Sequence, residues 1–165
     1  MSGTSKSETP VLIDFREKMS RGVLPQWIVD HLDEYERDPE KGHLWDARPF
    51  GGGERTPCML LTTRGRKTGR QLTLPLIYGR DGDDVIIVGS KGGAAENPAW
   101  MNNLLADPNV GVQVAADQYH ATARVSSGAE RARLWDMMAK VYPPYLDYQS
   151  RTQREIPVVV LSRKK

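Results

Sequence analysis

Cysteine and histidine are scarce in this sequence of 165 residues, and their scarcity excludes several kinds of site. The single cysteine, Cys58, cannot form an internal disulfide and fits a reducing compartment, so we expect a cytoplasmic protein. Its neighbours are apolar, which favours a buried structural thiol over a nucleophile. The histidines, His31, His43 and His120, are far apart and lack the spacing of metal ligands, so we expect no metal site.

Long apolar runs and a large excess of one charge are also missing. No stretch approaches the length of a membrane span, and the first ten residues lack the apolar core of a signal peptide. With 23 Lys and Arg against 21 Asp and Glu, the net charge is only +2, which argues against bulk binding to nucleic acid. The length predicts one domain with a real hydrophobic core.

Positive charge is nevertheless concentrated in one loop. Residues 64–70, Arg-Gly-Arg-Lys-Thr-Gly-Arg, hold four cations, two glycines and no acid. Glycines let backbone N–H groups approach a ligand closely, and successive turn amides form concavities that suit anions. This basic loop therefore fits a phosphate or a carboxylate, although an exposed charged hairpin tip explains the same pattern.

Helical periods appear in four places. Val11, Leu12, Phe15 and Met19 have helical spacing, and residues 25–35 repeat it until Asp38-Pro39 ends the helix. Two later helices are expected over 97–107, with Asn97 as N-cap and Pro98 in the first turn, and over 127–141, opened by a capping box at Ser127–Glu130.

Strand patterns fill the rest of the chain, at 59–63, 72–78, 85–88, 110–114, 121–125 and 156–161. Pro75 predicts an edge or a bulge, and Arg80-Asp81-Gly82-Asp83 predicts a hairpin turn. Adjacent strands with few crossovers argue against a parallel doubly wound sheet. We therefore predict an α+β fold in which helices pack outside an antiparallel, barrel-like sheet.

Several familiar catalytic motifs are excluded. Lys67-Thr68 imitates a P-loop, but Arg66 occupies the required glycine position. The triple glycine 51–53 is no dinucleotide fingerprint, because Thr56 stands where the third glycine of the motif is needed. There is no Gly-x-Ser-x-Gly elbow.

Three segments could instead converge on one ligand. They are the basic loop, the glycine-rich run Gly89–Gly93 with its hydroxyl and cation, and the helix start at Asn97. Cations would hold an anionic tail, and apolar walls would hold a flat ring. Three tyrosines near the C-terminus, Tyr142, Tyr145 and Tyr148, suit the mouth of a pocket, although core packing explains them equally well.

These motifs together resemble the deazaflavin-dependent nitroreductase family over roughly residues 56–161. The resemblance rests on Thr62–Gly69, Pro75-Leu76, Gly89–Gly93, Asn97–Trp100, Ala106–Pro108 and Tyr142–Tyr145. It implies a split β-barrel, the 5-deazaflavin coenzyme F-420 and hydride transfer to quinones, nitroaromatics or other activated acceptors.

The resemblance also implies roles for particular residues. Arg66, Lys67 and Thr68 would hold the phosphate and oligoglutamate tail, and Thr73, Leu74, Pro75, Leu76 and Ile77 would line its path. Val88, Gly89, Ser90 and Lys91 would border the ring, and Ala99, Trp100, Met101, Asn102 and Asn103 would close over it. Tyr145 and Ser90 would act on the acceptor, in a pocket formed with Tyr142 and Tyr148.

Three alternatives stay open at this point: an FMN-dependent enzyme on the same barrel, a carrier that binds coenzyme without turnover, and a nucleic-acid module using the basic loop. We expect residues 1–10 to be disordered, 11–55 to form a helical segment and 56–165 to form the barrel. Expected partners are a small-molecule acceptor, a second copy of the chain, and a membrane surface touched through the N-terminal helices, with no nucleic acid.

Overall fold

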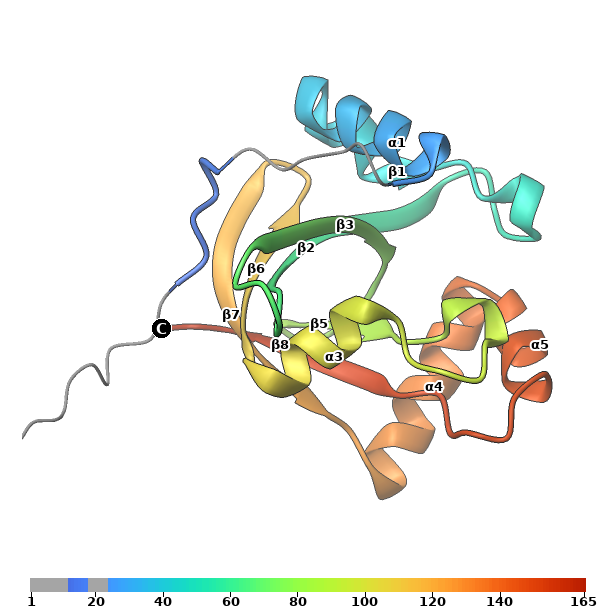
Figure 1. The fold of residues 1–165 in the computed structure, drawn as a ribbon. Coiled ribbons are helices and arrows are strands. Elements are labelled where there is room, and N and C mark those ends of the chain that lie inside the picture. Colours follow the sequence, from blue (N-terminus) through green and yellow to red (C-terminus); the bar gives the residue numbers. More distant parts are fainter. Residues whose placement is uncertain (1–11, 18–23) are drawn as a thin grey trace, which may run out of the picture.

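The computed structural model describes residues 12–17 and 24–165. The expected disorder of residues 1–10 and the positions Val11 and Met19 therefore lie outside the described residues. The described chain folds into one curled antiparallel sheet with helices outside it (Figure 1), which confirms the predicted α+β class.

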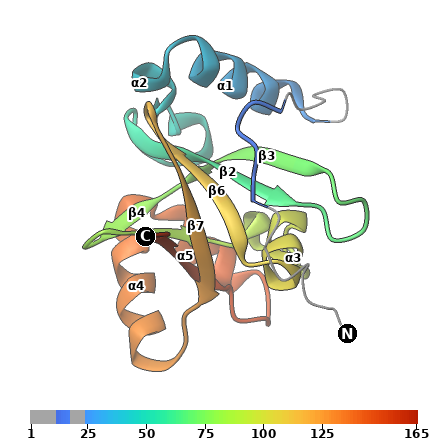
Figure 2. The ribbon, with the colours of Figure 1, turned by 90° about the vertical axis from the view of Figure 1, so that its left-hand side faces the viewer.

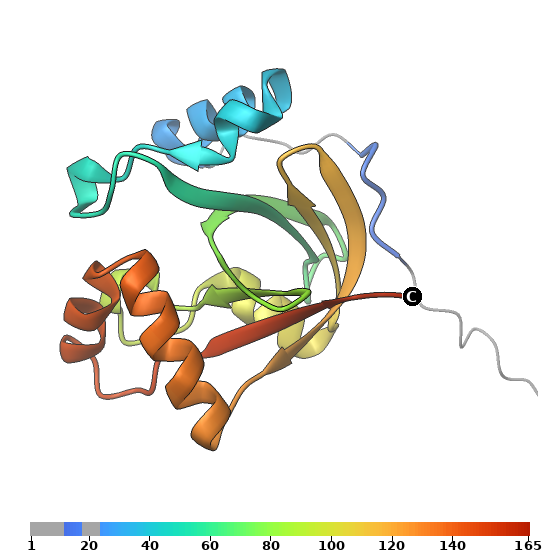
Figure 3. The same ribbon diagram turned by 180° about the vertical axis from the view of Figure 1, so that it is seen from behind.

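Eight strands make the sheet: β1 (Leu44–Trp45), β2 (Thr56–Arg64), β3 (Gln71–Ile77), β4 (Gly79–Asp81), β5 (Asp84–Val88), β6 (Asn109–Val114), β7 (Asp117–Val125) and β8 (Val158–Arg163). They follow the order β1-β2-β6-β7-β8-β5-β4, and β3 pairs with β2 off this path. Seen from behind (Figure 3), β2 and β3 form one wall, β5 and β8 the other, and β6 and β7 join them.

The helices are α1 (Gln26–Arg37), α2 (Pro39–Gly42), α3 (Ala99–Ala106), α4 (Gly128–Val141) and α5 (Pro144–Ser150), with 3-10 turns η2 (Arg48–Phe50) and η3 (Lys91–Gly93). Figure 2 shows α1 over one side of the barrel and α4 on the opposite side. Between them the hydrophobic residues form two buried clusters. The first fills the barrel, and the second lies between β5, β8, α4 and α5.

The hairpin of β2 and β3, whose side chains alternate between the two faces of the sheet, positions the basic loop. The hairpin of β2 and β3 pairs Leu61 with Leu74 and Arg64 with Gln71, so the basic loop is the hairpin tip. Met59, Leu61 and Leu74 face the core inside the barrel. Within the described residues β3 pairs with β2 alone, so the edge predicted from Pro75 is confirmed.

Three local predictions are wrong, each because a distant partner intervenes. Leu12–Glu17 is a turn and extended chain rather than a helix, since Ile13 is buried and the Asp14 backbone pairs with Gln71. The α3 N-cap is Pro98, with no side-chain cap, because Asn97 Oδ1 accepts from Arg154. Ser127 is the N-cap of α4 but makes no capping hydrogen bond, and Glu130 pairs with Arg124 instead.

Candidate functional site

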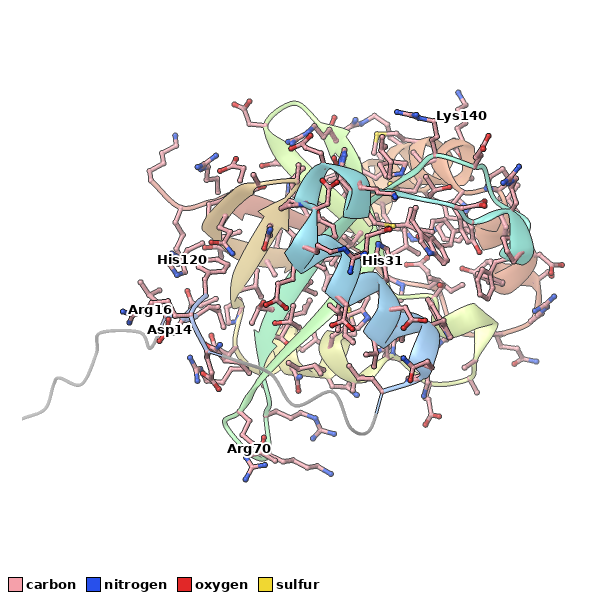
Figure 4. The ribbon with its side chains drawn as sticks, turned by 90° about the horizontal axis from the view of Figure 1, so that it is seen from above. Asp14, Arg16, His31, Arg70, His120 and Lys140 are labelled. Atoms are coloured by element: carbon pink, nitrogen blue, oxygen red, sulfur yellow. The ribbon has the colours of Figure 1, made fainter. Side chains whose placement is uncertain are left out.

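The basic loop has a defined shape set by its own backbone. Gly65 N–H donates to the Arg70 carbonyl at 2.7 Å, and Gly69 N–H donates to the Gly65 carbonyl at 2.8 Å. Gly69 has a φ of +73°, a conformation that other residues adopt only with strain. Thr68 Oγ1 accepts from Arg70 N–H at 3.1 Å. Arg64 donates to the Gly69 and Leu12 carbonyls and to Gln71 Oε1, whereas Arg66, Lys67 and Arg70 are exposed, and Figure 4 shows Arg70 at the tip of the loop.

A buried asparagine ties this loop to α3. Asn103 is 7% exposed; its Oδ1 accepts from Arg66 N–H at 3.1 Å, and its Nδ2 donates to Thr63 Oγ1 at 3.1 Å. Both ends of the amide are therefore used within the protein. Asn103 therefore positions the loop against the helix, and the coenzyme contact implied for it by the resemblance stays a prediction.

A hollow of about 300 Å³ lies between the basic loop and the first turns of α3. Its lining consists of Gly65, Arg66, Lys67, Thr68, Ala99, Asn102 and Asn103. Among the described residues no carboxylate forms an ion pair with Arg66, Lys67 or Arg70. Unpaired cations beside backbone N–H groups at a helix start make this hollow suited to an anion.

Not every residue expected here reaches the hollow. Trp100 is 5% exposed and belongs with Met101 to the core of the barrel. Lys91 lies on the other glycine-rich loop, where its Nζ is 3.1 Å from Glu96 Oε1. Lys91 therefore does not line the hollow at the basic loop, and strands β3, β4 and β5 separate the two loops in the chain.

Strand β3 divides its residues between two faces. Leu74 and Leu76 pack against the core of the barrel, whereas Thr73 faces outward and its hydroxyl pairs with that of Thr62 at 2.8 Å. At the end of the strand, Ile77 packs against the second cluster, which includes Tyr142 and Tyr145. The strand thus runs from the basic loop to the second hydrophobic cluster, but only alternate residues can face one ligand.

The glycine loop, Gly89–Gly93, packs against α5 and against Pro157, the residue before β8. A Cβ on Gly89 would come within 2.9 Å of Pro157, and one on Gly93 within 2.7 Å of the Tyr148 carbonyl. Lys91 adopts a φ of +47°, in the left-handed region. Gly93 therefore lies close to the Tyr148 backbone. The acceptor pocket expected from Ser90 and the tyrosines stays a prediction.

Arg154 is a residue of this region that the sequence reasoning missed. Its guanidinium donates to the carbonyls of Gly89, Ser90 and Ala94 and to Asn97 Oδ1, at 2.8–3.1 Å. All four acceptors lie 57–65 residues earlier in the chain, so no local pattern in the sequence indicates them.

The three tyrosines form a cluster of rings. Tyr145 packs edge-on against Tyr142, with centroids 4.9 Å apart, and against Tyr148, 6.3 Å apart. The hydroxyls of Tyr142 and Tyr148 are 3.1 Å apart, and Tyr142 also donates to the Phe50 carbonyl. Burial raises the pKa of Tyr142 and of Tyr145 well above the ordinary value for a phenol, so both are protonated near neutral pH.

The hydroxyl of Tyr145 has no hydrogen-bond partner among the described residues, although the residue is only 4% exposed. In the described part of the chain, the only fully enclosed side-chain N and O atoms without a partner are Arg64 Nε and Arg131 Nε. The Tyr145 hydroxyl therefore keeps contact with solvent, and a ligand at the edge of the cluster could accept from it.

A larger cavity, about 480 Å³, lies under α1 and Asp14–Glu17 on the outer face of the sheet. Its polar lining is largely paired within the protein: Gln71 with Asp14, Thr62 with Thr73, and Gln113 with Gln118. Over residues 12–17 and 24–165, no helix is long and apolar enough to cross a membrane.

Comparison with known proteins gives concordant matches. The model of the family described as F420H(2)-dependent quinone reductase matches residues 42–163. The F420H(2)-dependent quinone reductase Rv1261c from Mycobacterium tuberculosis is 43% identical over 111 residues, which cover 66% of this chain and 74% of that protein.

Solved structures show the same likeness. An F420-H2 dependent reductase, FDR-A, is 37% identical with a TM-score of 0.61, over 64% of this chain and 94% of that one. A structure described as a domain-swapped dimer is 32% identical with a TM-score of 0.62, over 81% and 98%. The split β-barrel implied by the motifs is thereby confirmed.

Proposed function

Because the chain belongs to the F420H(2)-dependent quinone reductase family, we propose that the hollow between its basic loop and α3 holds the anionic tail of coenzyme F-420, and that its tyrosine cluster receives the quinone. The protein is an oxidoreductase that transfers hydride from the reduced coenzyme to a quinone. The observation that carries the assignment of the tail is the group of unpaired cations facing the start of α3.

The residues of the hollow fit such a group chemically. Arg66 and Lys67 offer charge to phosphate and carboxylate oxygens, Thr68 offers a hydroxyl, and the amide of Asn102 lines the opposite wall. The FMN alternative has less support, because a single phosphate does not call for both cations of the hollow, Arg66 and Lys67, together with the exposed Arg70 beside them.

Strand β3 connects the two halves of the proposed site. Seven residues of extended chain span roughly 20 Å, at about 3.3 Å per residue. The strand begins at the basic loop and ends at Ile77, which packs against the second cluster, to which Tyr142 and Tyr145 belong. That distance supports a long molecule with its charged end at Lys67 and its flat ring toward Tyr148.

When bound, the reduced deazaflavin supplies the hydride, and the protein supplies orientation and hydrogen bonds. The Tyr145 hydroxyl, protonated and without a partner in the described residues, would donate to the quinone oxygen that gains charge. Ser90 would contact the same pocket from the glycine loop. No protein nucleophile is required.

Titration of the purified protein with coenzyme F-420 and, separately, with FMN tests the proposal. We expect saturable coenzyme binding that weakens as salt is added, and much weaker binding of FMN. A menadione assay with reduced coenzyme then separates an enzyme from a carrier, because a carrier would bind the coenzyme without oxidising it.

Two partners stay proposals of ours. The 32% identical structure described as a domain-swapped dimer supports a homodimer, which sedimentation would test. Trp27 and Phe50 are 48% and 46% exposed and stack with Trp45, and an exposed aromatic group of this kind supports contact with a membrane surface. Loss of vesicle co-sedimentation in Trp27→Ala would test that contact.

A further inference from the structure

Arg154 holds together residues 89–97, a segment whose regular structure is limited to the 3-10 turn η3. From one guanidinium, Nε donates to the Ala94 carbonyl at 2.9 Å and Nη2 to the Ser90 carbonyl at 2.8 Å. Nη1 donates to both the Gly89 carbonyl, at 3.1 Å, and Asn97 Oδ1, at 2.9 Å. Four acceptors between residues 89 and 97 therefore meet one planar cation.

These bonds determine which way the peptide groups of the glycine loop point. In a planar trans peptide, the carbonyl of one residue and the N–H of the next point in opposite directions. The carbonyls of Gly89 and Ser90 both face Arg154, so the N–H groups of Ser90 and Lys91 face away from it. Arg154 thus sets the direction of two backbone donors in the proposed ring site.

The same guanidinium also reaches the start of α3. Asn97 comes two residues before Ala99, the first residue of the helix, and Ala99 and Asn102 line the hollow at the basic loop. One side chain is therefore hydrogen-bonded both to the loop of the proposed ring site and to Asn97, which leads into the helix of the proposed tail site.

We infer that Arg154 is a positioning residue that couples these two ends of the coenzyme site, and this inference rests on the proposed function. It acts through the backbone of Ser90 and Lys91 and through Asn97. Only a planar, forked cation can satisfy four acceptors arranged in this way; an ammonium has the charge but not the geometry. Burial lowers the pKa of Arg154, yet the group stays charged at any ordinary pH.

Arg154→Lys is the decisive variant, because it keeps the positive charge and removes the planar set of guanidinium N–H donors. Two ligands are titrated: coenzyme F-420 and the same deazaflavin nucleoside without phosphate and glutamate tail. We expect the Kd of Arg154→Lys to rise at least tenfold for both ligands, since the variant disturbs the ring end as well as the tail end. Lys67→Ala, by contrast, should raise the Kd only for the tailed coenzyme.

The matched control is Arg133→Gln on α4, where an exposed arginine pairs with Asp81. It should leave both affinities unchanged. Amide hydrogen exchange of the free protein supplies a readout that does not depend on coenzyme: residues 89–97 should exchange faster in Arg154→Lys, whereas the basic loop should not change.

The outcomes separate this inference from the proposed function. If Arg154→Lys binds both ligands as tightly as the wild type does, the role of Arg154 is overturned and the proposed function stays in place. The role would also be overturned if Arg154→Lys lowered the Tm but left the Kd of both ligands unchanged at a temperature where the variant is folded. That result would show that Arg154 is purely structural. Wild-type protein that binds neither deazaflavin would refute the proposed function and the coenzyme role of Arg154, even if exchange at 89–97 increased.

Discussion

Replacing Lys67 with alanine tests the tail site with little risk to the fold. Lys67 is exposed at the hairpin tip, its side chain lines the hollow with α3, and no described carboxylate pairs with it. The loop keeps its shape through bonds between Gly65, Gly69 and Arg70, none of which involves the lysine side chain. The substitution should therefore change binding without changing stability.

The size of the effect follows from the setting of the lysine. A hydrogen bond to a charged group contributes about 1.5–3 kcal/mol. Because Lys67 stays open to solvent, screening places the expected loss near the lower end, about 1–2 kcal/mol, which corresponds to about a 5- to 30-fold rise in Kd. Added salt should shrink the difference between variant and wild type, since it screens exposed charges.

The assay is a titration of coenzyme F-420 into wild type, Lys67→Ala and the control Lys140→Ala at low and high salt. Lys140 is an exposed lysine of α4 that lies far from Arg70 and the basic loop (Figure 4). An unchanged Kd in Lys67→Ala, or an equal loss in Lys140→Ala, would contradict the reasoning and remove the loop from the site.

Three further predictions concern the rest of the molecule. Tyr145→Phe should lower the turnover of quinone while the coenzyme Kd stays the same, because only the unpartnered hydroxyl is removed; a loss of coenzyme binding would show that Tyr145 is misplaced. In urea unfolding, Gly93→Ala should lower the free energy of unfolding more than Gly92→Ala. Both glycines have a positive φ, which costs another residue about 1–3 kcal/mol, but only at Gly93 would the new Cβ meet backbone, at 2.7 Å. Equal losses in the two variants would contradict the importance of that contact. Burial lowers the pKa of His31, so the unfolded chain binds the proton more readily than the folded one. The free energy of unfolding should therefore fall as the pH drops below about 6.5. Between about pH 7.5 and about pH 5.5 this fall should be smaller in His31→Gln, and an identical fall would exclude His31 as the cause.

The strands and the barrel were predictable because their signals are local. Alternation in Val110–Val114 and Ala121–Val125, and Pro75 on an edge strand, needed only the period of an extended chain. The basic loop was predictable for the same reason, since its glycines and cations are adjacent in sequence.

The local predictions that were wrong concern residues whose hydrogen-bond partners lie far away in the chain. Asn97 has the composition of a helix cap, but a guanidinium 57 residues later takes its side-chain oxygen. Leu12 and Phe15 have helical spacing, but the Asp14 backbone pairs with the amide of Gln71, and this bond replaces helix formation. Arg154 itself lies in a polar segment with no recognisable motif, so its role appears only when its four acceptors are brought together.

A single-turnover experiment tests the central claim most directly. The protein is mixed with one equivalent of reduced coenzyme F-420 without oxygen, a quinone is added, and the visible absorption band of the oxidised deazaflavin is followed. We predict rapid, stoichiometric return of that band with wild type, and slower return with Tyr145→Phe. A band that returns no faster with the protein than without it would contradict the assignment.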